Sequence, residues 1–468
     1  MRFRAPGRTS IQAVPDYALK RAALQSRPPV QGGQLRLSKS TVSNLFRYQS
    51  GRAPGQTLSL GQFNEVIALD REARTLDVEG LTTFERIVAH CLPRGFLLPV
   101  TPELKHITVG GATVGIGIES TCFRHGFVHD ALREAEVLLP GGEIVTCTAD
   151  NEHADLFRAL PNSYGTLGYI LRARLAVIPA RPFVHLRVTC FATLAEFLDA
   201  MRQATRDDAV DFVEGLLFED RRFYLMTGVF VDEVPQVDDI LREYVFYRLV
   251  QERKDIYLAT ADYIFRYDPE WFWNIPDTPV YDLFRRYAPR RFRNSGFYTR
   301  YAAWKRRWRE RVPVLAPATT EPLIQDWEVP WDAAGELVEF CLREVTLDGR
   351  PWAAVPIRTP RQPTLYPIAA DRLYFNLGCY CQVRKASGQE PYYHTKIVDR
   401  KCFELGGIKM LYSSTFMDRA DFDAHFNAAA YRALKKKYDP QGCAPTLFEK
   451  VALQNRDRGN RGQSKVPE

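Results

Sequence analysis

The sequence contains no apolar run of about 18 residues, the length that a membrane-spanning helix needs, so no transmembrane helix is expected. Residues 1–7 also lack the apolar core of a secretion signal. The nine cysteines are scattered, and the only close pair is Cys379 with Cys381, which argues against a zinc ribbon or an iron–sulfur site. This pattern fits reduced thiols. We therefore expect a cytoplasmic protein whose contact with membranes is at most peripheral.

Two common phosphate-binding motifs are missing as well. The sequence has no Gly-x-x-x-x-Gly-Lys-Ser/Thr, and Gly110, Gly115 and Gly117 do not form Gly-x-Gly-x-x-Gly. Residues 104–121 are nevertheless rich in glycine and read LKHITVGGATVGIGIEST. The β-branched residues before the glycines predict a strand that leads into a loop, whose amides could bind phosphate oxygens. A tight structural turn is the alternative.

Length and charge restrict the function only weakly. A chain of 468 residues, 46% of them hydrophobic, can bury the cores of two or three domains. The net charge of +7 is modest and does not indicate nucleic acid binding. Between residues 285 and 308, however, basic residues alternate with aromatic ones. A solvated helical surface is the simplest interpretation, and a membrane interface is favoured over RNA stacking.

The segments around the glycine-rich stretch predict a mixed module of strands and helices. The spacing of Thr82 and Glu85 is that of a capping box, which predicts a helix that ends near Pro93. Residues 66–69 and 76–78 predict a hairpin. A second hairpin is expected from residues 135–139 and 143–147, and further strands at 35–39 and 170–177.

Several short motifs of this module occur in a family-specific order. They are VEGLT at 78–82, LPVTPEL at 98–104, TVGG at 108–111, GIGIES at 115–120, GTLG at 165–168 and, near the other end, KMLY at 409–412. This succession resembles the FAD-binding domain of the vanillyl-alcohol oxidase and p-cresol methylhydroxylase (PCMH) superfamily. It is more closely similar to the delta-24-sterol reductase branch.

The resemblance implies an α+β fold with three parts. Residues 1–182 would form a two-lobed PCMH-type FAD-binding domain, and residues 183–400 a separate α+β cap domain for the substrate. Residues 401–468 would return and pack on the FAD-binding domain. The cofactor would be non-covalent FAD, because the first FAD loop, residues 39–47, contains no histidine for covalent attachment.

The resemblance also implies which residues contact the cofactor. Two loops would clamp its phosphates and flavin edge, and one strand would complete the pocket, although Ser40 and Thr41 could instead only stabilise a turn. No metal site is expected. The expected FAD-binding residues are Ser40, Thr41, Val42, Ser43, Asn44, Thr108, Val109, Gly110, Gly111, Gly115, Gly117, Ile118, Ser120, Gly165, Gly168 and Ile170.

Three functions remain open. The first is FAD-dependent reduction of an isolated C=C bond in a sterol, isoprenoid or methylene fatty-acyl lipid, with electrons from NADPH or a redox partner protein. The second is an FAD-dependent oxidase or dehydrogenase of an alcohol or hydroxy acid. The third is a scaffold without redox activity that binds a lipid or an acidic partner. No nucleic acid partner is expected.

Reduction of an alkene requires a proton as well as a hydride, so an acid with a pKa near neutrality should face the flavin. The family places polar groups of the cap near flavin N5. The candidates for proton donation or substrate orientation follow the strand-like segment 374–381 and are Tyr392, Tyr393, His394 and Lys396. His106 and His125 are the next candidates.

Overall fold

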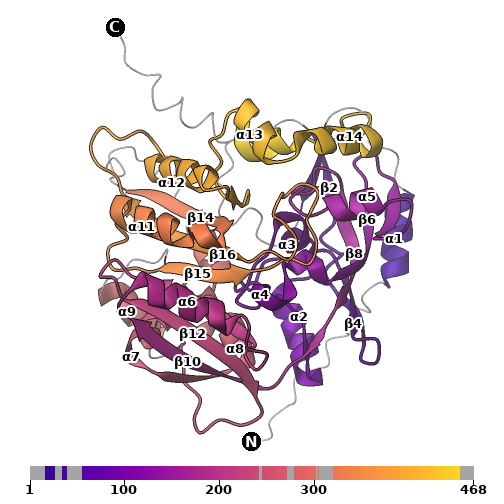
Figure 1. Ribbon diagram of the computed structural model, residues 1–468. Helices are drawn as coiled ribbons and strands as arrows, with labels where there is room; N and C mark the ends of the chain where they lie inside the picture. The colour runs from indigo at the N-terminus through magenta and orange to yellow at the C-terminus, as the bar shows by residue number, and fades with distance from the viewer. Residues whose placement is uncertain are drawn as a thin grey trace, which may run out of the picture.

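The protein is a mixed α/β structure with two main sheets (Figure 1). In Figure 1 the five-stranded sheet is drawn in purple on the right, and the eight-stranded sheet runs from magenta to orange on the left. Two small two-stranded sheets, β1–β2 and β5–β9, complete the set in the part of the chain that is described. The computed structural model describes residues 16–26, 34–38, 55–241, 245–270, 273, 279–301, 304 and 320–453.

The five-stranded sheet has the order β3-β4-β8-β6-β7, and all its neighbouring strands are antiparallel. Asp70 closes the β3–β4 turn, because its carboxylate accepts the amides of Glu72 and Ala73. Both predicted hairpins are confirmed. The strands are β3 Val66–Asp70, β4 Thr75–Glu79, β6 Leu132–Leu138, β7 Ile144–Thr148 and β8 Tyr169–Ala176.

Helix α2, Phe84–Cys91, is the predicted amphipathic helix and buries Phe84, Ile87 and Val88. Its expected cap is wrong by one residue. Thr83 is the N-cap and accepts the Arg86 amide at 3.5 Å, whereas the hydroxyl of Thr82 donates to the carbonyl of Glu65. The other short helices of this part are α1 Tyr17–Gln25, α4 Cys122–His125 and α5 Ala154–Ala159, with 3₁₀ turns at Leu92–Arg94 and Val128–Ala131.

The predicted strand and loop at the glycine-rich stretch are corrected by the structure. Val109–Gly115 forms helix α3, with Thr108 as its N-cap. Before it, only an isolated bridge joins Thr108 to Thr83. Glycine and valine disfavour helix by propensity. Tertiary contacts therefore select the helix, chiefly the Gly110 amide, which donates to the Gly80 carbonyl at 2.9 Å.

The eight-stranded sheet has the order β13-β10-β12-β11-β15-β16-β14-β17. Its longest pairing joins β14 to β16 in antiparallel register, with Asp326 opposite Gly378. The strands are β10 Phe183–Phe191, β11 Phe212–Leu217, β12 Phe223–Val231, β13 Asp255–Ala259, β14 Thr320–Pro330, β15 Trp352–Ile357, β16 Tyr374–Arg384 and β17 Ile408–Lys409.

Three helices cover one face of this sheet, and they lie toward the viewer in Figure 1. They are α6 Leu194–Ala204, α11 Ala334–Glu344 and α12 Tyr393–Glu404. Trp327 of β14 points to this side, because its indole N–H donates to Asp399 of α12 at 2.8 Å. Since side chains alternate along a strand, Asp326 and Glu328 belong to the opposite face.

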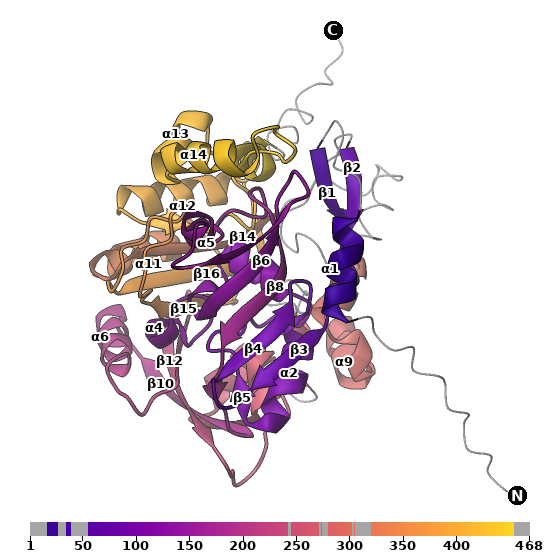
Figure 2. The same ribbon diagram turned by 90° about the vertical axis from the view of Figure 1, so that its right-hand side faces the viewer.

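That opposite face lies toward the five-stranded sheet (Figure 2). The amide of Val213 in β11 donates to the carbonyl of Ser120, which follows α3, at 2.9 Å. The short elements on this side are α7 Phe246–Glu252, α8 Thr260–Ile264 and α9 Pro279–Tyr287, with 3₁₀ turns at Asp268–Glu270 and Arg290–Phe292.

The C-terminal segment crosses the top of the molecule in Figure 1 and returns to the five-stranded sheet. The hydroxyl of Tyr431 bonds to Thr166 at 2.9 Å, and the ammonium of Lys435 donates to the Thr166 carbonyl at 2.9 Å. The remaining elements are α13 Arg419–His425, α14 Ala428–Tyr438, β1 Gln34–Ser38, β2 Gly55–Ser59, β5 Phe96–Leu97, β9 Ile178–Pro179, a 3₁₀ turn at Trp331–Ala333 and a π-helical turn at Glu449–Leu453. Among the described helices, none has the length and apolar character required to cross a membrane.

Candidate functional site

The structure brings most of the expected FAD-binding residues together around α3. Gly110 packs directly on the end of β4, where an added Cβ would lie 2.7 Å from the Gly80 carbonyl oxygen. Gly80 in turn abuts Ile170 of β8, whose carbonyl oxygen would lie 1.9 Å from a Cβ at Gly80. These glycines let three backbone segments meet at one place. Ser40, Thr41, Val42, Ser43 and Asn44 lie outside the described residues.

The segment Gly165–Ile170 meets the other end of α3. The amide of Tyr164 donates to the Val114 carbonyl at 3.0 Å, and its hydroxyl donates to the Gly115 carbonyl at 3.0 Å. Gly168 has a φ of +152° and fits tightly against Val137 of β6, which a Cβ would approach to 2.6 Å. A side chain at this position would be both strained and obstructed.

Two glycines of α3 present backbone to open space. Gly111 is exposed, and a Cβ there would approach only the Thr108 hydroxyl, at 2.9 Å. At Gly115 an added Cβ would have ordinary contact with the Tyr164 ring, at 3.5 Å. Uncovered backbone beside hydroxyl groups suits a cofactor that must approach the chain closely, so these residues fit FAD.

A buried ion cluster connects this segment to the eight-stranded sheet. We call Glu103, Glu119, Glu214, Arg266 and Tyr267 the Arg266 cluster. The Arg266 guanidinium lies 2.7 Å from a carboxylate oxygen of Glu119, 2.7 Å from one of Glu214 and 3.9 Å from one of Glu103. Its side chain has no solvent exposure. The Tyr267 hydroxyl donates to Glu214.

Burial governs the protonation of this cluster. It raises the pKa of Glu119 and raises that of Glu103 well above the ordinary carboxyl value, and the nearby charges of Glu119 and Glu214 add to the effect on Glu103. The ion pairs with Glu119 and Glu214 keep Arg266 charged, and its pKa is raised in spite of burial.

The face of β14 and β16 that lies toward the five-stranded sheet is polar. We call Asp326, Glu328, Asn376 and Tyr380 the polar face. Asp326 accepts hydrogen bonds from Tyr380 at 2.7 Å, from Tyr412 at 2.7 Å and from Asn376 at 2.9 Å. These bonds lower the pKa of Asp326, but desolvation outweighs them and raises it above its ordinary value.

Gly378 makes room for this arrangement. It stands opposite Asp326 in the β14–β16 register, and a Cβ there would lie 2.6 Å from the Asp326 carboxylate and 3.0 Å from the Tyr380 ring. A larger residue would displace both groups.

Two buried atoms of the polar face have no hydrogen-bond partner among the described residues. They are Oε1 of Glu328 and Oδ1 of Asn376. The other carboxylate oxygen of Glu328 accepts the hydroxyl of Tyr366, whose ring packs edge-on against Phe127. Buried polar atoms are usually paired, so we expect water or a ligand to supply a polar group at this place.

The residues predicted to donate a proton lie at the start of α12. His394 is buried, and its Nδ1 lies 2.9 Å from a carboxylate oxygen of Glu321. Lys396 pairs with Glu390 on the exposed surface, and Tyr393 is half-buried beside His394. None of their contacts in the described part of the chain joins them to α3 or to the Arg266 cluster.

The histidines near α3 differ in their surroundings. Burial lowers the pKa of His125 to about 4 and also lowers that of His129, whose ring stacks on Phe127. Both are therefore neutral imidazoles near neutrality. His106 lies against Gly296, where a Cβ would come within 2.7 Å of its ring.

Neither the Arg266 cluster nor the polar face was among the site residues predicted from the sequence. For β14 a signal existed. Asp326 and Glu328 stand two residues apart in a strand with apolar neighbours, which places two carboxylates on one face of a buried strand. For the Arg266 cluster no local signal existed, because Glu119 and Arg266 are 147 residues apart.

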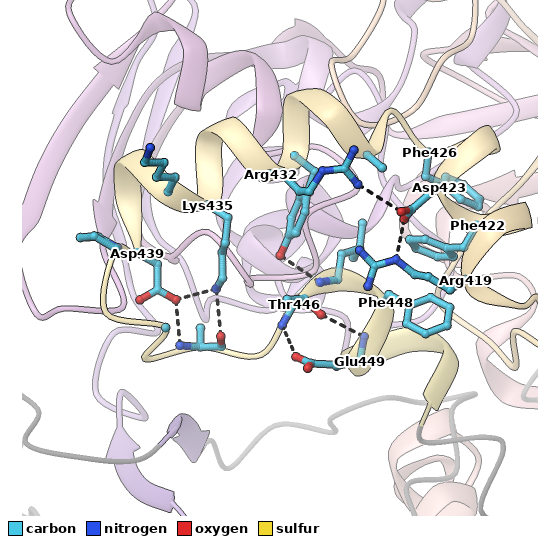
Figure 3. A pocket seen from close by; sticks show the side chains of 17 residues that line it. Arg419, Phe422, Asp423, Phe426, Arg432, Lys435, Asp439, Thr446, Phe448 and Glu449 are labelled. Carbon is cyan, nitrogen blue, oxygen red and sulfur yellow. Dashed lines mark hydrogen bonds and ion pairs between the residues drawn. The ribbon is translucent and has the colours of Figure 1, made fainter.

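A separate pocket of 520 Å³ lies in the C-terminal segment, between α13, α14 and the chain that follows (Figure 3). Three of its cations are already paired. Arg419 and Arg432 bind Asp423 at 2.8 and 3.1 Å, and Lys435 binds Asp439 at 2.6 Å. These pairs help to hold the segment together, and no ligand is assigned to the pocket.

Comparisons with known proteins agree with this arrangement. A family model described as an FAD binding domain matches residues 37–148. The delta(24)-sterol reductase of Macaca fascicularis is 27% identical over 408 residues, covering 83% of this chain and 76% of the relative. The delta(24)-sterol reductase homolog of Caenorhabditis elegans is 25% identical over 447 residues, covering 88% and 82%. Cytokinin dehydrogenase 4 of Oryza sativa subsp. japonica is 30% identical over 149 residues, covering 31% and 28%.

The matched FAD binding domain includes α3, where the exposed glycine backbone lies, and the similarity to the sterol reductases extends well beyond that domain. The chain is therefore an FAD-dependent oxidoreductase with an FAD binding domain, and it is similar to the delta(24)-sterol reductases over most of its length.

Proposed function

We propose that the enzyme reduces an isolated C=C bond in a lipid, such as a sterol, an isoprenoid or a methylene fatty-acyl chain. The observation that carries this proposal is the similarity to delta(24)-sterol reductases over 83% of the chain. A match of that length cannot lie within the first 182 residues and must include much of the eight-stranded sheet. The relative that is named an oxidising enzyme, cytokinin dehydrogenase 4, matches only 31% of the chain.

The proposed cofactor site uses the backbone of α3 and the strand after Gly168. Of the expected contacts, Gly111, Gly115, Gly117 and Ile118 retain some exposure. Thr108, Val109, Gly110, Ser120, Gly165, Gly168 and Ile170 are buried and position that backbone. FAD, when bound, supplies hydride to carbon.

In this proposal the eight-stranded sheet is the cap, with domain boundaries near residues 182 and 400. Its polar face and the Arg266 cluster line the side toward the FAD-binding domain, where a substrate would lie. Tyr393, His394 and Lys396 remain candidates for orienting the substrate at the other end of β14. NADPH or a redox partner protein is the proposed source of electrons.

We also propose a cytoplasmic enzyme that meets membranes peripherally. All nine cysteines are free thiols, which fits a reducing compartment. Leu283 and Tyr287 are 62% and 71% exposed on α9, and Trp304 is 61% exposed. Arg286 and Arg291 are exposed nearby. Such a surface suits an anionic bilayer. We expect the protein to sediment with anionic but not with neutral vesicles. The double variant Leu283→Ser with Trp304→Ser should lose this sedimentation.

The direction of the reaction is tested by two anaerobic mixing experiments. NADPH or dithionite should reduce the bound FAD, and a sterol with a Δ24 double bond should then reoxidise it. An alcohol or hydroxy acid should leave the oxidised FAD unchanged. If an alcohol bleaches the flavin and no alkene restores its colour, the enzyme is an oxidase or dehydrogenase. A purified protein without flavin would favour the scaffold.

A further inference from the structure

The Arg266 cluster holds more carboxylates than cations. Glu119 and Glu214 each have a close ion pair with Arg266, at 2.7 Å. Both have further donors, since Glu119 accepts the Ser120 amide at 3.0 Å and Glu214 accepts the Tyr267 hydroxyl. Glu103 is the third carboxylate and lies 3.9 Å from the same guanidinium. A buried site with one cation cannot readily hold three negative charges, so the carboxyl group with the weakest contacts retains its proton.

Glu103 is also the carboxyl group of this cluster that a ligand can reach. Its side chain is 18% exposed, whereas those of Glu119 and Glu214 are 1% and 3% exposed. Glu103 lies in the segment just before α3, the helix whose backbone is open at Gly111 and Gly115. Its carboxyl group is close enough to Tyr380 of the polar face for the two side chains to interact electrostatically.

A second observation indicates a ligand in front of the same face. Oε1 of Glu328 and Oδ1 of Asn376 are buried and have no partner among the described residues. Leaving such atoms unpaired costs about 1–3 kcal/mol each. Asn376 donates a hydrogen bond to Asp326, which also accepts the Tyr380 hydroxyl. These atoms therefore belong to the polar face, which includes Tyr380, the residue near Glu103.

We propose that Glu103 is the proton donor of the reaction, an assignment that rests on the proposed function. As hydride reaches one alkene carbon, the O–H bond of Glu103 breaks and its proton forms a C–H bond at the other carbon. The electron pair of the O–H bond stays on the carboxylate. Hydride and proton together add two hydrogens across the double bond. Arg266 stabilises the resulting carboxylate, and water restores its proton through the exposed edge.

The groups that face Glu103 come from four elements, and they set the direction of its pH dependence. They are Glu119 and Cys122 around the start of α4, Arg266 and Tyr267 after α8, Glu214 of β11 and Tyr380 of β16. Burial and the excess of carboxylates together raise the pKa of Glu103 well above the ordinary carboxyl value, so the group stays neutral there. A donor is active in its protonated form, so the rate of alkene reduction falls as pH rises through the raised pKa of Glu103.

The protonation of Glu103 is tested on the holoenzyme without turnover. Infrared spectra of the wild type and Glu103→Gln, recorded at neutral pH, should differ by the carbonyl band of one protonated carboxylic acid. Raising the pH should remove that band from the wild type. In Glu119→Gln, which has one carboxylate fewer, the band should disappear at a lower pH than in the wild type. A spectrum without the band at neutral pH, or a band that Glu103→Gln keeps, overturns the proposal.

The role of Glu103 is tested by measuring the two half-reactions separately, reduction of the FAD and its reoxidation by the alkene. Glu103→Gln should bind FAD and accept electrons like the wild type, while reoxidation by the alkene slows about 100- to 10,000-fold. Glu103→Asp should restore part of the rate with a shifted pH profile. Glu72→Gln, in the exposed β3–β4 turn, is the matched control and should behave like the wild type. Normal reoxidation of Glu103→Gln overturns the assignment. If the wild type reduces no alkene at all, the proposed function fails, and the infrared result still reports on Glu103.

Discussion

At the scale of single residues, two glycines of helix α3 have different structural roles. Gly110 is surrounded by protein, since an added Cβ would lie 2.7 Å from a backbone oxygen of Gly80. Gly115 is open apart from the Tyr164 ring at 3.5 Å. Neither has a positive φ, so backbone strain does not distinguish them. Packing explains the glycine at the first position, and for the second position we propose access to the cofactor.

This difference predicts opposite outcomes for the same substitution. Gly110→Val should lower the free energy of unfolding by about 1–3 kcal/mol, because the backbone of β4 must move. Gly115→Val should leave the stability of the FAD-free protein nearly unchanged and should abolish retention of FAD. Denaturant unfolding and the ratio of flavin to protein absorbance measure the two effects. Full flavin occupancy in Gly115→Val would mean that this glycine only shapes the helix end.

At the scale of elements, β14 separates two environments. Trp327 and Gln325 point to the helices, while Asp326 and Glu328 point to the FAD-binding side. On the helix side, Lys409 of β17 forms a buried ion pair with Asp399 of α12 at 2.6 Å, and Asp399 also accepts the Trp327 indole. This ion pair holds α12 against the β17 edge of the eight-stranded sheet.

Removal of one member of the Lys409–Asp399 ion pair should therefore lower the free energy of unfolding. Lys409→Met leaves a buried aspartate without its cation, which should destabilise the protein by about 3–5 kcal/mol. The double variant Lys409→Met with Asp399→Asn removes both charges and keeps an acceptor for Trp327, so most of the loss should be recovered. Urea unfolding of the three proteins measures this. If the single variant is as stable as the wild type, the ion pair does not hold α12 in place.

The elements that the sequence predicted best are those with local causes. The hairpins at 66–78 and 135–147 follow from turn residues and alternation, and α2 follows from its apolar spacing. Helix α3 could not be predicted, because its glycines and valines disfavour helix and its hydrogen bonds come from Gly80 and Tyr164. Tertiary contacts override local preference there.

At the scale of the whole molecule, the site forms where distant parts of the chain meet. The glycine motifs allowed α3 and the strand after Gly168 to be predicted as a cofactor segment. The Arg266 cluster could not be predicted, because Glu119 lies between α3 and α4 whereas Glu214 lies in β11 of the eight-stranded sheet. Arg266 becomes their shared partner only when these distant segments pack together. The C-terminal segment, held to Thr166 by Tyr431 and Lys435, likewise depends on the complete fold.

The attachment of the cofactor is a second property of the whole molecule. Residues 39–47 contain no histidine, so we expect FAD to be bound without a covalent bond. Acid precipitation of the purified protein should release all of the yellow colour into the supernatant. Flavin that remains with the denatured polypeptide would show a covalent link.

The most direct test of alkene reduction is a single anaerobic mixing experiment with the wild-type holoenzyme. The bound FAD is first reduced with dithionite, and a sterol with a Δ24 double bond is then added while the flavin absorbance is followed. The absorbance of oxidised FAD should return, one sterol should be saturated for each flavin, and the rate should fall as the pH is raised. A flavin that stays reduced with every alkene lipid, but is reduced from its oxidised form by an alcohol, would contradict alkene reduction.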